Sequence, residues 1–239
     1  MLEAPILSIV GVNKRFGGLV AVSNLNFDVQ AGQVVGLMGP NGAGKTTLLN
    51  VIAGKYQPDS GAIRFKGNDI TGLPQHKIRH LGIARTYQIP QPFTNLSVRE
   101  NILVATTYGR RLKKAAVIED AKILDLVGLS QQKDMLARDL TVLNLKKLEL
   151  ARALGSNPEL LLLDEVAAGS TEAEIPRILA TIEAIRKMGK TVVLIEHVMK
   201  VMVNAVDRIV VIDKGIKIAE GKPQEVMEDN KVIEAYFGA

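Results

Sequence analysis

The sequence predicts an α/β fold in which a mainly parallel sheet is interrupted by an inserted helical segment. Two runs of consecutive apolar residues, 160–163 and 192–195, are typical of strands buried on both faces. After Pro158, strand patterns alternate with helical patterns, which indicates parallel strands joined by covering helices. Between about residues 77 and 157 the apolar spacing is mainly helical, so this block reads as an insertion into the sheet domain.

Period-two and helical spacings predict the individual elements in order. The first are strands at 6–12, 24–29 and 33–38, a helix at 45–53, a turn at 58–61 and a strand at 62–66. The middle block holds a short strand at 82–87 and helices at about 97–106, 115–127 and 145–154, the first opened by a capping box of Ser97 and Glu100. Strands at 160–164, 191–196 and 208–213 and a helix at 172–188 follow. We expect one domain over 1–239, with a core of about 1–76 and 158–239 and a helical subdomain of about 77–157.

The composition excludes several classes of protein. Because the chain has no cysteine, disulfides, thiolate metal sites and cysteine nucleophiles are excluded. No apolar run approaches the roughly 18 residues of a membrane span, and the N-terminal residues lack a secretory pattern, so we expect an intracellular protein. The net charge of +5 suits a nucleotide, a nucleic acid or an anionic lipid. Aromatic residues at 4%, with no tryptophan, disfavour base stacking, so we expect no nucleic-acid partner.

A complete phosphate-binding pattern, G-x-x-x-x-G-K-[ST], covers eight consecutive residues: Gly39, Pro40, Asn41, Gly42, Ala43, Gly44, Lys45 and Thr46. Glycine lets backbone N–H groups approach a phosphate chain, and the following helix adds the partial positive charge of its N-terminus. Lys45 is expected to reach the outer phosphates and the Thr46 hydroxyl to ligate Mg²⁺, with Thr47 also at the nucleotide. A chance glycine-rich turn is the alternative, with odds on the order of one in a hundred at a glycine frequency of about 7%.

Two carboxylates, Asp164 and Glu165, end the apolar run at 160–163. The carboxyl end of a central parallel strand lies beside the phosphate loop. Asp164 is expected to hold Mg²⁺, mostly through water, and Glu165 to polarise the attacking water or accept its proton. Solvated acids at a strand end are a common alternative, but the intact loop upstream favours the catalytic interpretation.

Three further residues are candidates that depend on this context. His197 closes the strand at 191–196, where an imidazole can contact the γ-phosphate and align the water, or can be an ordinary strand-end histidine. Gln88 precedes a proline-containing stretch, and its amide can ligate Mg²⁺ or the water, although most strand-end glutamines have no such role. Phe16 can stack on adenine or belong to the core.

Two other groups of residues are interpreted as structural. His76 and His80 lie on an expected surface helix without acidic partners at metal-ligand spacing. A basic cluster can touch anionic headgroups, but a solvated helix face is the favoured interpretation; it comprises Arg110, Arg111, Lys113 and Lys114.

Taken in order, these elements resemble the ATPases of ABC transporters over the whole chain. The region of Phe16 is similar to that family's adenine-stacking loop, and Gln88 to its glutamine loop, which faces the membrane subunit. Asp164 and Glu165 resemble the strand carboxylates, and His197 the switch histidine. The resemblance implies a P-loop NTPase core with a mainly parallel sheet, an antiparallel β subdomain and an inserted helical subdomain.

Three stretches, at 14–22, 150–154 and 232–238, further resemble the ATPase subunits of branched-chain amino acid importers. Importers of urea or short amides and lipid-export ATPases share much of this similarity. The resemblance implies ATP and Mg²⁺ as cofactors, and ATP hydrolysis that powers import of branched-chain amino acids or related small polar solutes. It also implies transmembrane permease subunits, a second ATPase subunit in an ATP-sandwich dimer, a separate solute-binding protein, and a cytoplasmic place on the inner face of the cell membrane.

Two alternatives to this function stay open, and a third is disfavoured. The chain can instead serve a lipid-export system, or be a regulatory module that hydrolyses ATP weakly. A soluble relative acting on nucleic acid or ribosomes would have tandem ATPase domains or long coiled-coil insertions, and this sequence has neither.

The family's signature, L-S-G-G-Q, is altered in this sequence, where it aligns with residues 140–144. Thr141 keeps a hydroxyl and is expected to contact the nucleotide bound by the partner chain. Val142 and Leu143 replace both glycines, so we expect poorer closure over the ATP that faces this signature.

Two more departures follow the strand carboxylates. Val166 stands where the family has proline after the catalytic carboxylate. Thr171 stands where the family has the aspartate of its D-loop, the loop that follows the catalytic carboxylate. We expect Thr171 to cap the next helix together with Glu174.

Overall fold

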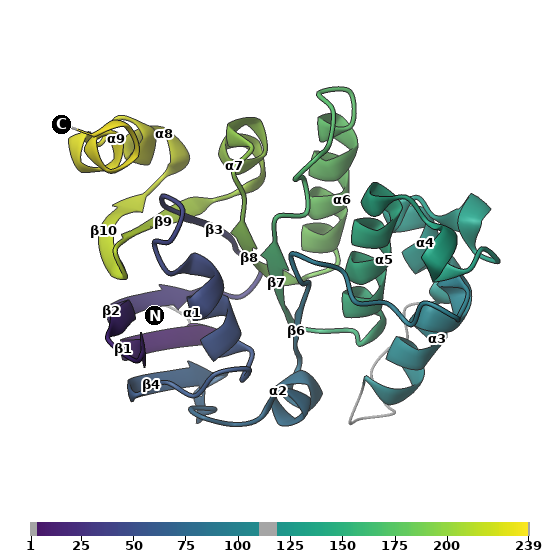
Figure 1. The fold of residues 1–239 in the computed structure, drawn as a ribbon, viewed down its shortest axis with the longest axis horizontal. Helices are drawn as coiled ribbons and strands as arrows, with labels where there is room; N and C mark the ends of the chain where they lie inside the picture. The colour runs from purple at the N-terminus through teal and green to yellow at the C-terminus, as the bar shows by residue number, and fades with distance from the viewer. Residues whose placement is uncertain (1–3, 110–118, 239) are drawn as a thin grey trace.

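The computed structural model describes residues 4–109 and 119–238 (Figure 1). Figure 1 shows a central sheet, with a group of strands on one side of it and a group of helices, α3 to α5, on the other. The basic cluster of Arg110, Arg111, Lys113 and Lys114 lies outside the described residues, as do residues 115–118 of one expected helix.

The central sheet has six strands, and its mainly parallel character is confirmed. Their order is β10 (Ile216–Gly221), β9 (Arg208–Asp213), β3 (Val34–Met38), β8 (Thr191–Ile195), β7 (Leu160–Asp164) and β6 (Ile83–Arg85). Every neighbouring pair is parallel except β9 and β10. Residues of β3, β7 and β8 are buried throughout, as the continuous apolar runs predict.

The second sheet is antiparallel, which confirms the β subdomain. Its order is β2 (Leu19–Val29), β1 (Leu7–Phe16), β4 (Ser60–Phe65) and β5 (Asn68–Asp69). The first two strands are longer than the sequence pattern predicts, because Gly17 adopts φ 57° in a tight turn that lets Phe16 pair with Leu19. Similarly, β4 begins inside the expected turn at 58–61.

Two apolar cores lie on opposite faces of the central sheet, because successive strand residues point to opposite sides. Leu160 and Leu162 belong to the core that also contains Leu48 and Leu49 of α1 (Lys45–Ile52). Figure 1 shows α1 between the two sheets. The alternating residues of β7, including Leu161, belong to the core that contains the helical subdomain.

The remaining helices are α2 (Gln75–Leu81), α3 (Val98–Tyr108), α4 (Asp120–Val127), α5 (Val142–Gly155), α6 (Ile175–Lys187), α7 (Met199–Ala205), α8 (Pro223–Met227) and α9 (Asn230–Phe237). The capping box that opens α3 is confirmed: Glu100 N donates to Ser97 Oγ, and Ser97 N donates to Glu100 Oε2. The strand β6 lies within the block expected to be mainly helical, yet it is an edge strand of the central sheet. The sequence analysis did not predict α7, α8, α9 or β10. Within the described ranges, no helix combines the length and apolar character needed to cross a membrane.

Candidate nucleotide site

The phosphate-binding pattern forms the turn between β3 and α1. Gly39 has φ 148° and a Cβ there would lie 1.9 Å from the Ile212 carbonyl oxygen. Gly44 has φ 102°, and a Cβ there would lie 2.1 Å from the Ala21 carbonyl oxygen. Only glycine tolerates these positions, so the backbone path of the loop depends on them.

Lys45 is folded back into this loop. Its Nζ donates to the carbonyl oxygens of Gly39 at 2.6 Å and Pro40 at 2.8 Å, and the residue is 6% exposed. Burial lowers the pKa of Lys45, while the charges of Glu165 and Asp164 raise it. The ammonium is thus held beside the two strand carboxylates, where an added phosphate chain would supply its counter-charge.

Asp164 ends β7 and forms a buried ion pair with a residue that the sequence analysis missed. Arg85 of β6 donates to Asp164 Oδ2 at 3.3 Å and to Asn50 Oδ1 at 2.6 Å. Burial raises the pKa of Asp164, and Arg85 opposes this shift. The other oxygen, Asp164 Oδ1, is buried without a hydrogen-bond partner among the described residues.

Glu165 is the point where three of the candidates meet. Gln88 Nε2 donates to Glu165 Oε2 at 3.0 Å, and His197 Nε2 lies 3.2 Å from Glu165 Oε1. The Glu165 backbone has φ 52°, a conformation that a residue with a side chain adopts only when its surroundings hold it there. The structure therefore brings Gln88, Glu165 and His197 together at the carboxyl edge of the sheet.

Two further residues missed by the sequence analysis hold the segment that follows β7. Lys146 of α5 donates to the carbonyl oxygens of Glu165 at 3.1 Å and Ala168 at 2.8 Å. Glu196 is buried at the end of β8, and its Oε1 accepts from Ala167 N at 2.6 Å. Burial raises the pKa of Glu196. In the sequence, the one feature that could have indicated a role for Glu196 is its position directly after a buried apolar strand.

The C-terminal helix also reaches the loop. Tyr236 of α9 accepts a hydrogen bond at 2.8 Å from Gly39 N, the first residue of the phosphate-binding pattern. Burial raises the pKa of Tyr236, and the bond from Gly39 opposes this shift. No local pattern in the sequence indicates this long-range contact.

Phe16 lies at the end of β1 and is 41% exposed, so it is not a core residue. Its ring packs edge-on against Tyr56, with centroids 5.1 Å apart. Lys14 Nζ lies over the Phe16 ring at 5.4 Å from its centroid. The ring is thus positioned by Tyr56 and Lys14 yet remains partly open to solvent, which is compatible with stacking on a base.

The altered signature forms the first turn of α5. Thr141 is the N-cap, and its hydroxyl accepts from Asn144 N at 3.3 Å; no hydrogen bond joins Thr141 to this chain's own phosphate loop in the residues described. Val142 is 71% exposed, whereas Leu143 lines a pocket beside α6. The expected pairing of Thr171 with Glu174 occurs, since Thr171 N and Oγ1 donate to Glu174 Oε2. The helix nevertheless begins only after Glu174, which is its N-cap.

The residues present fit a polyphosphate and a hard cation. The N-cap of α1 is Gly44, which supplies no side-chain cap, so the first backbone N–H groups of α1 are available to an anion. The exposed Thr46 hydroxyl and the unpartnered Asp164 Oδ1 are oxygen donors of the kind that Mg²⁺ prefers. No group of three or more histidine, cysteine and carboxylate residues that could hold a metal ion occurs in the part of the chain described.

The fold and the site define a P-loop ATPase with an inserted helical subdomain. Residues 22–168 match the family model described as ABC transporter, and residues 217–239 match one described as branched-chain amino acid ATP-binding cassette transporter. The chain therefore belongs to the ABC transporter family, as an ATP-binding cassette ATPase.

Similar proteins extend over essentially the whole chain. The high-affinity branched-chain amino acid transport ATP-binding protein BraF of Pseudomonas aeruginosa is 39% identical over 99% of each chain. The corresponding protein LivG of Escherichia coli K12 is 36% identical over 99% of each chain. A solved nucleotide-free ATP-binding cassette from an ABC transporter is 32% identical with a TM-score of 0.86, covering 99% of this chain and 100% of that one.

Proposed function

We propose that this chain hydrolyses ATP to power the import of branched-chain amino acids or related small polar solutes. The observation that carries the catalytic part is the convergence of Gln88 and His197 on Glu165, beside the buried Lys45. The solute is inferred from the full-length similarity to BraF and LivG, whose names specify branched-chain amino acid transport. The same similarity favours import over the lipid-export alternative.

The proposed chemistry is in-line attack of water on the γ-phosphorus of ATP, which releases ADP and inorganic phosphate. Lys45 and the N–H groups of the loop hold the phosphates, and Phe16 stacks on the adenine. Glu165 accepts the proton of the attacking water, while His197 and Gln88 keep the carboxylate and the water aligned. Positioning and electrostatic stabilisation supply most of the rate enhancement.

Mg²⁺ is part of the proposal. Thr46 Oγ1, Asp164 and Gln88 are the residues that would hold it, and when bound it neutralises charge on the transferring phosphoryl group. Arg85 donates a hydrogen bond to Asp164 Oδ2, which leaves Asp164 Oδ1 available as a ligand of the cation. Burial raises the pKa of Asp164, and the charge of Arg85 opposes this shift, so Arg85 favours the ionised form that would bind a cation.

A second ATPase subunit, identical or homologous, is proposed to close over the nucleotide in an ATP-sandwich dimer. Each site would combine one chain's phosphate loop with the other chain's signature, in which Thr141 is the nucleotide contact. Thr141 caps α5 and is exposed, which supports a role toward a partner.

The permease is proposed to dock on the stretch from Gln88 to Phe93. Ile89 and Phe93 are 75% and 47% exposed, although both are apolar. The stretch is tied to the helical subdomain, because Arg152 donates to Gln91 O and lies over the Phe93 ring at 5.1 Å. Movement of the helical subdomain would therefore move this surface.

A cavity of about 270 Å³ adjoins the same stretch and is lined by Arg79, Arg85, Arg152 and one carboxylate, Glu149. Glu149 pairs with Arg152 at 3.0 Å and Asp164 pairs with Arg85, which leaves Arg79 as the cation without a partner of its own within the described ranges. Arg79 Nε is buried without a partner among the residues described, and burial lowers the pKa of Arg79. We infer that the docking segment of the permease carries an acidic group for this cavity. This would place the chain peripherally, on the cytoplasmic side of the cell membrane, in a system that also has a solute-binding protein.

The domain division belongs to the proposal as well. We propose a core of about 1–76 and 158–239 and a helical subdomain of about 77–157, with β6 assigned to the core because it pairs with β7 in the central sheet.

Copurification from membranes tests the proposal. Affinity-tagged chain should retain a permease and a second ATPase, and the complex should hydrolyse ATP. A complex that binds ATP without turnover would favour the regulatory alternative, and one that holds lipid-export subunits would refute the proposed solute.

A further inference from the structure

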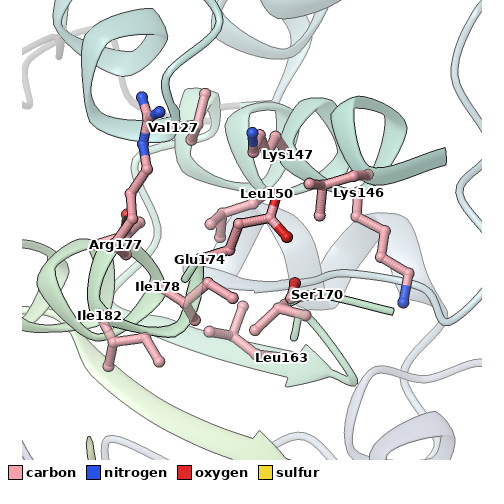
Figure 2. A pocket seen from close by; sticks show the side chains of 13 residues that line it. Val127, Lys146, Lys147, Leu150, Leu163, Ser170, Glu174, Arg177, Ile178 and Ile182 are labelled. Carbon is pink, nitrogen blue, oxygen red and sulfur yellow. Dashed lines mark hydrogen bonds between the residues drawn. The ribbon is translucent and has the colours of Figure 1, made fainter. Parts of the chain in front are cut away.

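A pocket of about 100 Å³ lies between α5 and α6 (Figure 2). Its apolar wall includes Leu150 of α5, Leu163 of β7, and Ile178 and Ile182 of α6. An apolar cavity of about 150 Å³ in another protein holds a benzene molecule, so this pocket has room for a small branched hydrocarbon group.

The departures from the family pattern gather at this pocket. Leu143 replaces a signature glycine, Val166 replaces the proline after the catalytic carboxylate, and both line it. Glu174, which accepts from the residue at the altered D-loop position, lines it as well. A glycine in place of Leu143 would remove one wall. The residues that alter the family's signature thus supply surface to an additional pocket.

Two cations belong to the lining. Lys147 Nζ has one long hydrogen bond, to Asn144 Oδ1 at 3.3 Å. The Arg177 guanidinium makes no hydrogen bond or ion pair within the described ranges, although the Arg177 backbone N–H donates to Glu174 O at 3.1 Å. Burial and then the positive charge of Arg177 lower the pKa of Lys147, and the charge of Glu174 opposes this shift. Glu174 supplies only one negative charge near these two cations, so a ligand carboxylate placed between Lys147 and Arg177 would reduce their remaining repulsion.

An acceptor and a donor complete the polar lining. Glu174 Oε2 accepts from Thr171, whereas no bond to Glu174 Oε1 occurs in the part of the chain that is described. Ser170 Oγ is buried and unpartnered among the same residues. Figure 2 shows the Glu174 carboxylate and the Ser170 hydroxyl within the space between α5 and α6. An unsatisfied buried hydroxyl is destabilising unless a ligand or water bonds to it.

We propose that this pocket binds a free amino acid with a branched apolar side chain. The side chain occupies the apolar wall, the α-carboxylate pairs with Lys147 and Arg177, and the α-ammonium pairs with Glu174 Oε1. The ligand class follows from the lining itself; its biological sense, recognition of imported solute by the ATPase, rests on the proposed function.

A ligand in this pocket contacts both subdomains at once, because α5 belongs to the helical insertion and β7 and α6 to the core. Lys146, next to Lys147, donates to the Glu165 carbonyl oxygen. Occupancy therefore restrains the element that positions the catalytic carboxylate, and binding is linked to the subdomain arrangement described here.

Calorimetric titration of the full chain with L-leucine tests the site. L-Leucine should bind more tightly than 4-methylpentanoate, which lacks the ammonium, 3-methylbutylamine, which lacks the carboxylate, and glycine, which lacks the side chain. Lys147→Met should weaken leucine binding by about tenfold or more, the effect of losing one charged hydrogen bond. Ser170→Leu, which fills the pocket, should abolish binding.

Lys187→Met is the control for Lys147→Met and should leave leucine affinity unchanged, since Lys187 is an exposed lysine on α6 with 75% of its side chain accessible. ATP binding by each variant verifies its fold. Absence of leucine binding at millimolar concentration by a chain that binds ATP would overturn the proposal, and so would equal affinities in the parent, Lys147→Met and Ser170→Leu. A transporter that imports another solute would refute the proposed function but leave the leucine titration unchanged.

Discussion

Replacing Glu165 by glutamine removes the proposed general base with the least other change. Glutamine has nearly the same shape, and its amide oxygen can still accept from Gln88 Nε2, which now lies 3.0 Å from Glu165 Oε2. Its amide group can donate to His197, whose Nε2 lies 3.2 Å from Oε1. The backbone bond from Glu165 N to Ile195 O is unaffected. The substitution therefore tests the charge and basicity of this side chain.

The magnitude follows from these contacts. Loss of a positioned general base slows a reaction by about 10²- to 10⁴-fold, which is about 2.7–5.4 kcal/mol in activation free energy at 1.36 kcal/mol per tenfold. Exchange of one hydrogen-bonded group for another changes the free energy of unfolding by only about 1 kcal/mol. We expect turnover to fall at least about 10²-fold, while ATP affinity stays near that of the parent because Lys45 and the loop are unchanged.

The assay is steady-state phosphate release by the chain assembled with its permease, together with equilibrium ATP binding. Glu183→Gln is the control, because Glu183 is a half-exposed carboxylate on α6 outside the site. ATP should accumulate in a closed dimer of the Glu165→Gln variant. Turnover at the parent rate, with the variant correctly folded, would refute the assignment of Glu165 as the base.

Four other substitutions test the remaining parts of the site. Lys45→Ala should abolish ATP binding or turnover, because the phosphates lose their point charge; unchanged ATP affinity and turnover would contradict the assignment of the loop. His197→Ala should slow turnover at nearly constant ATP affinity, and reduced thermal stability with normal specific activity would return His197 to a structural role. Phe93→Asp should reduce retention of the permease in pull-downs without affecting ATP binding, whereas crosslinks to the permease that avoid 88–93 would argue against this surface. The double substitution Val142→Gly and Leu143→Gly should raise ATP turnover at the site that faces this signature. Unchanged turnover would mean that the altered signature is simply tolerated.

The residues within continuous motifs could be predicted from the sequence, and the structure places them beside one another. The phosphate-binding pattern spans one turn and the start of α1, and Asp164 and Glu165 lie at and directly after the end of β7, so each group is specified by local spacing. Their roles remain predictions that the substitutions above test. The fold class followed from the same alternation of strands and helices.

The supporting residues could not be predicted, because they depend on which strands become neighbours. Arg85 meets Asp164 only because β6 pairs with β7, since the two residues are 79 positions apart in the sequence. Tyr236 reaches Gly39 across 197 residues. Lys146 is one of many helical lysines in the sequence, and only the packing of α5 beside β7 brings its Nζ to the Glu165 carbonyl oxygen.

ATP-driven uptake of labelled L-leucine tests the central claim most directly. The measurement uses proteoliposomes that contain the copurified complex, with ATP on the side of this chain and a solute-binding protein on the other. Parent complex should accumulate leucine only with ATP, and Glu165→Gln should reduce uptake and ATP turnover in parallel. Leucine accumulation that is independent of ATP, or that continues at the parent rate in the Glu165→Gln complex, would contradict the account.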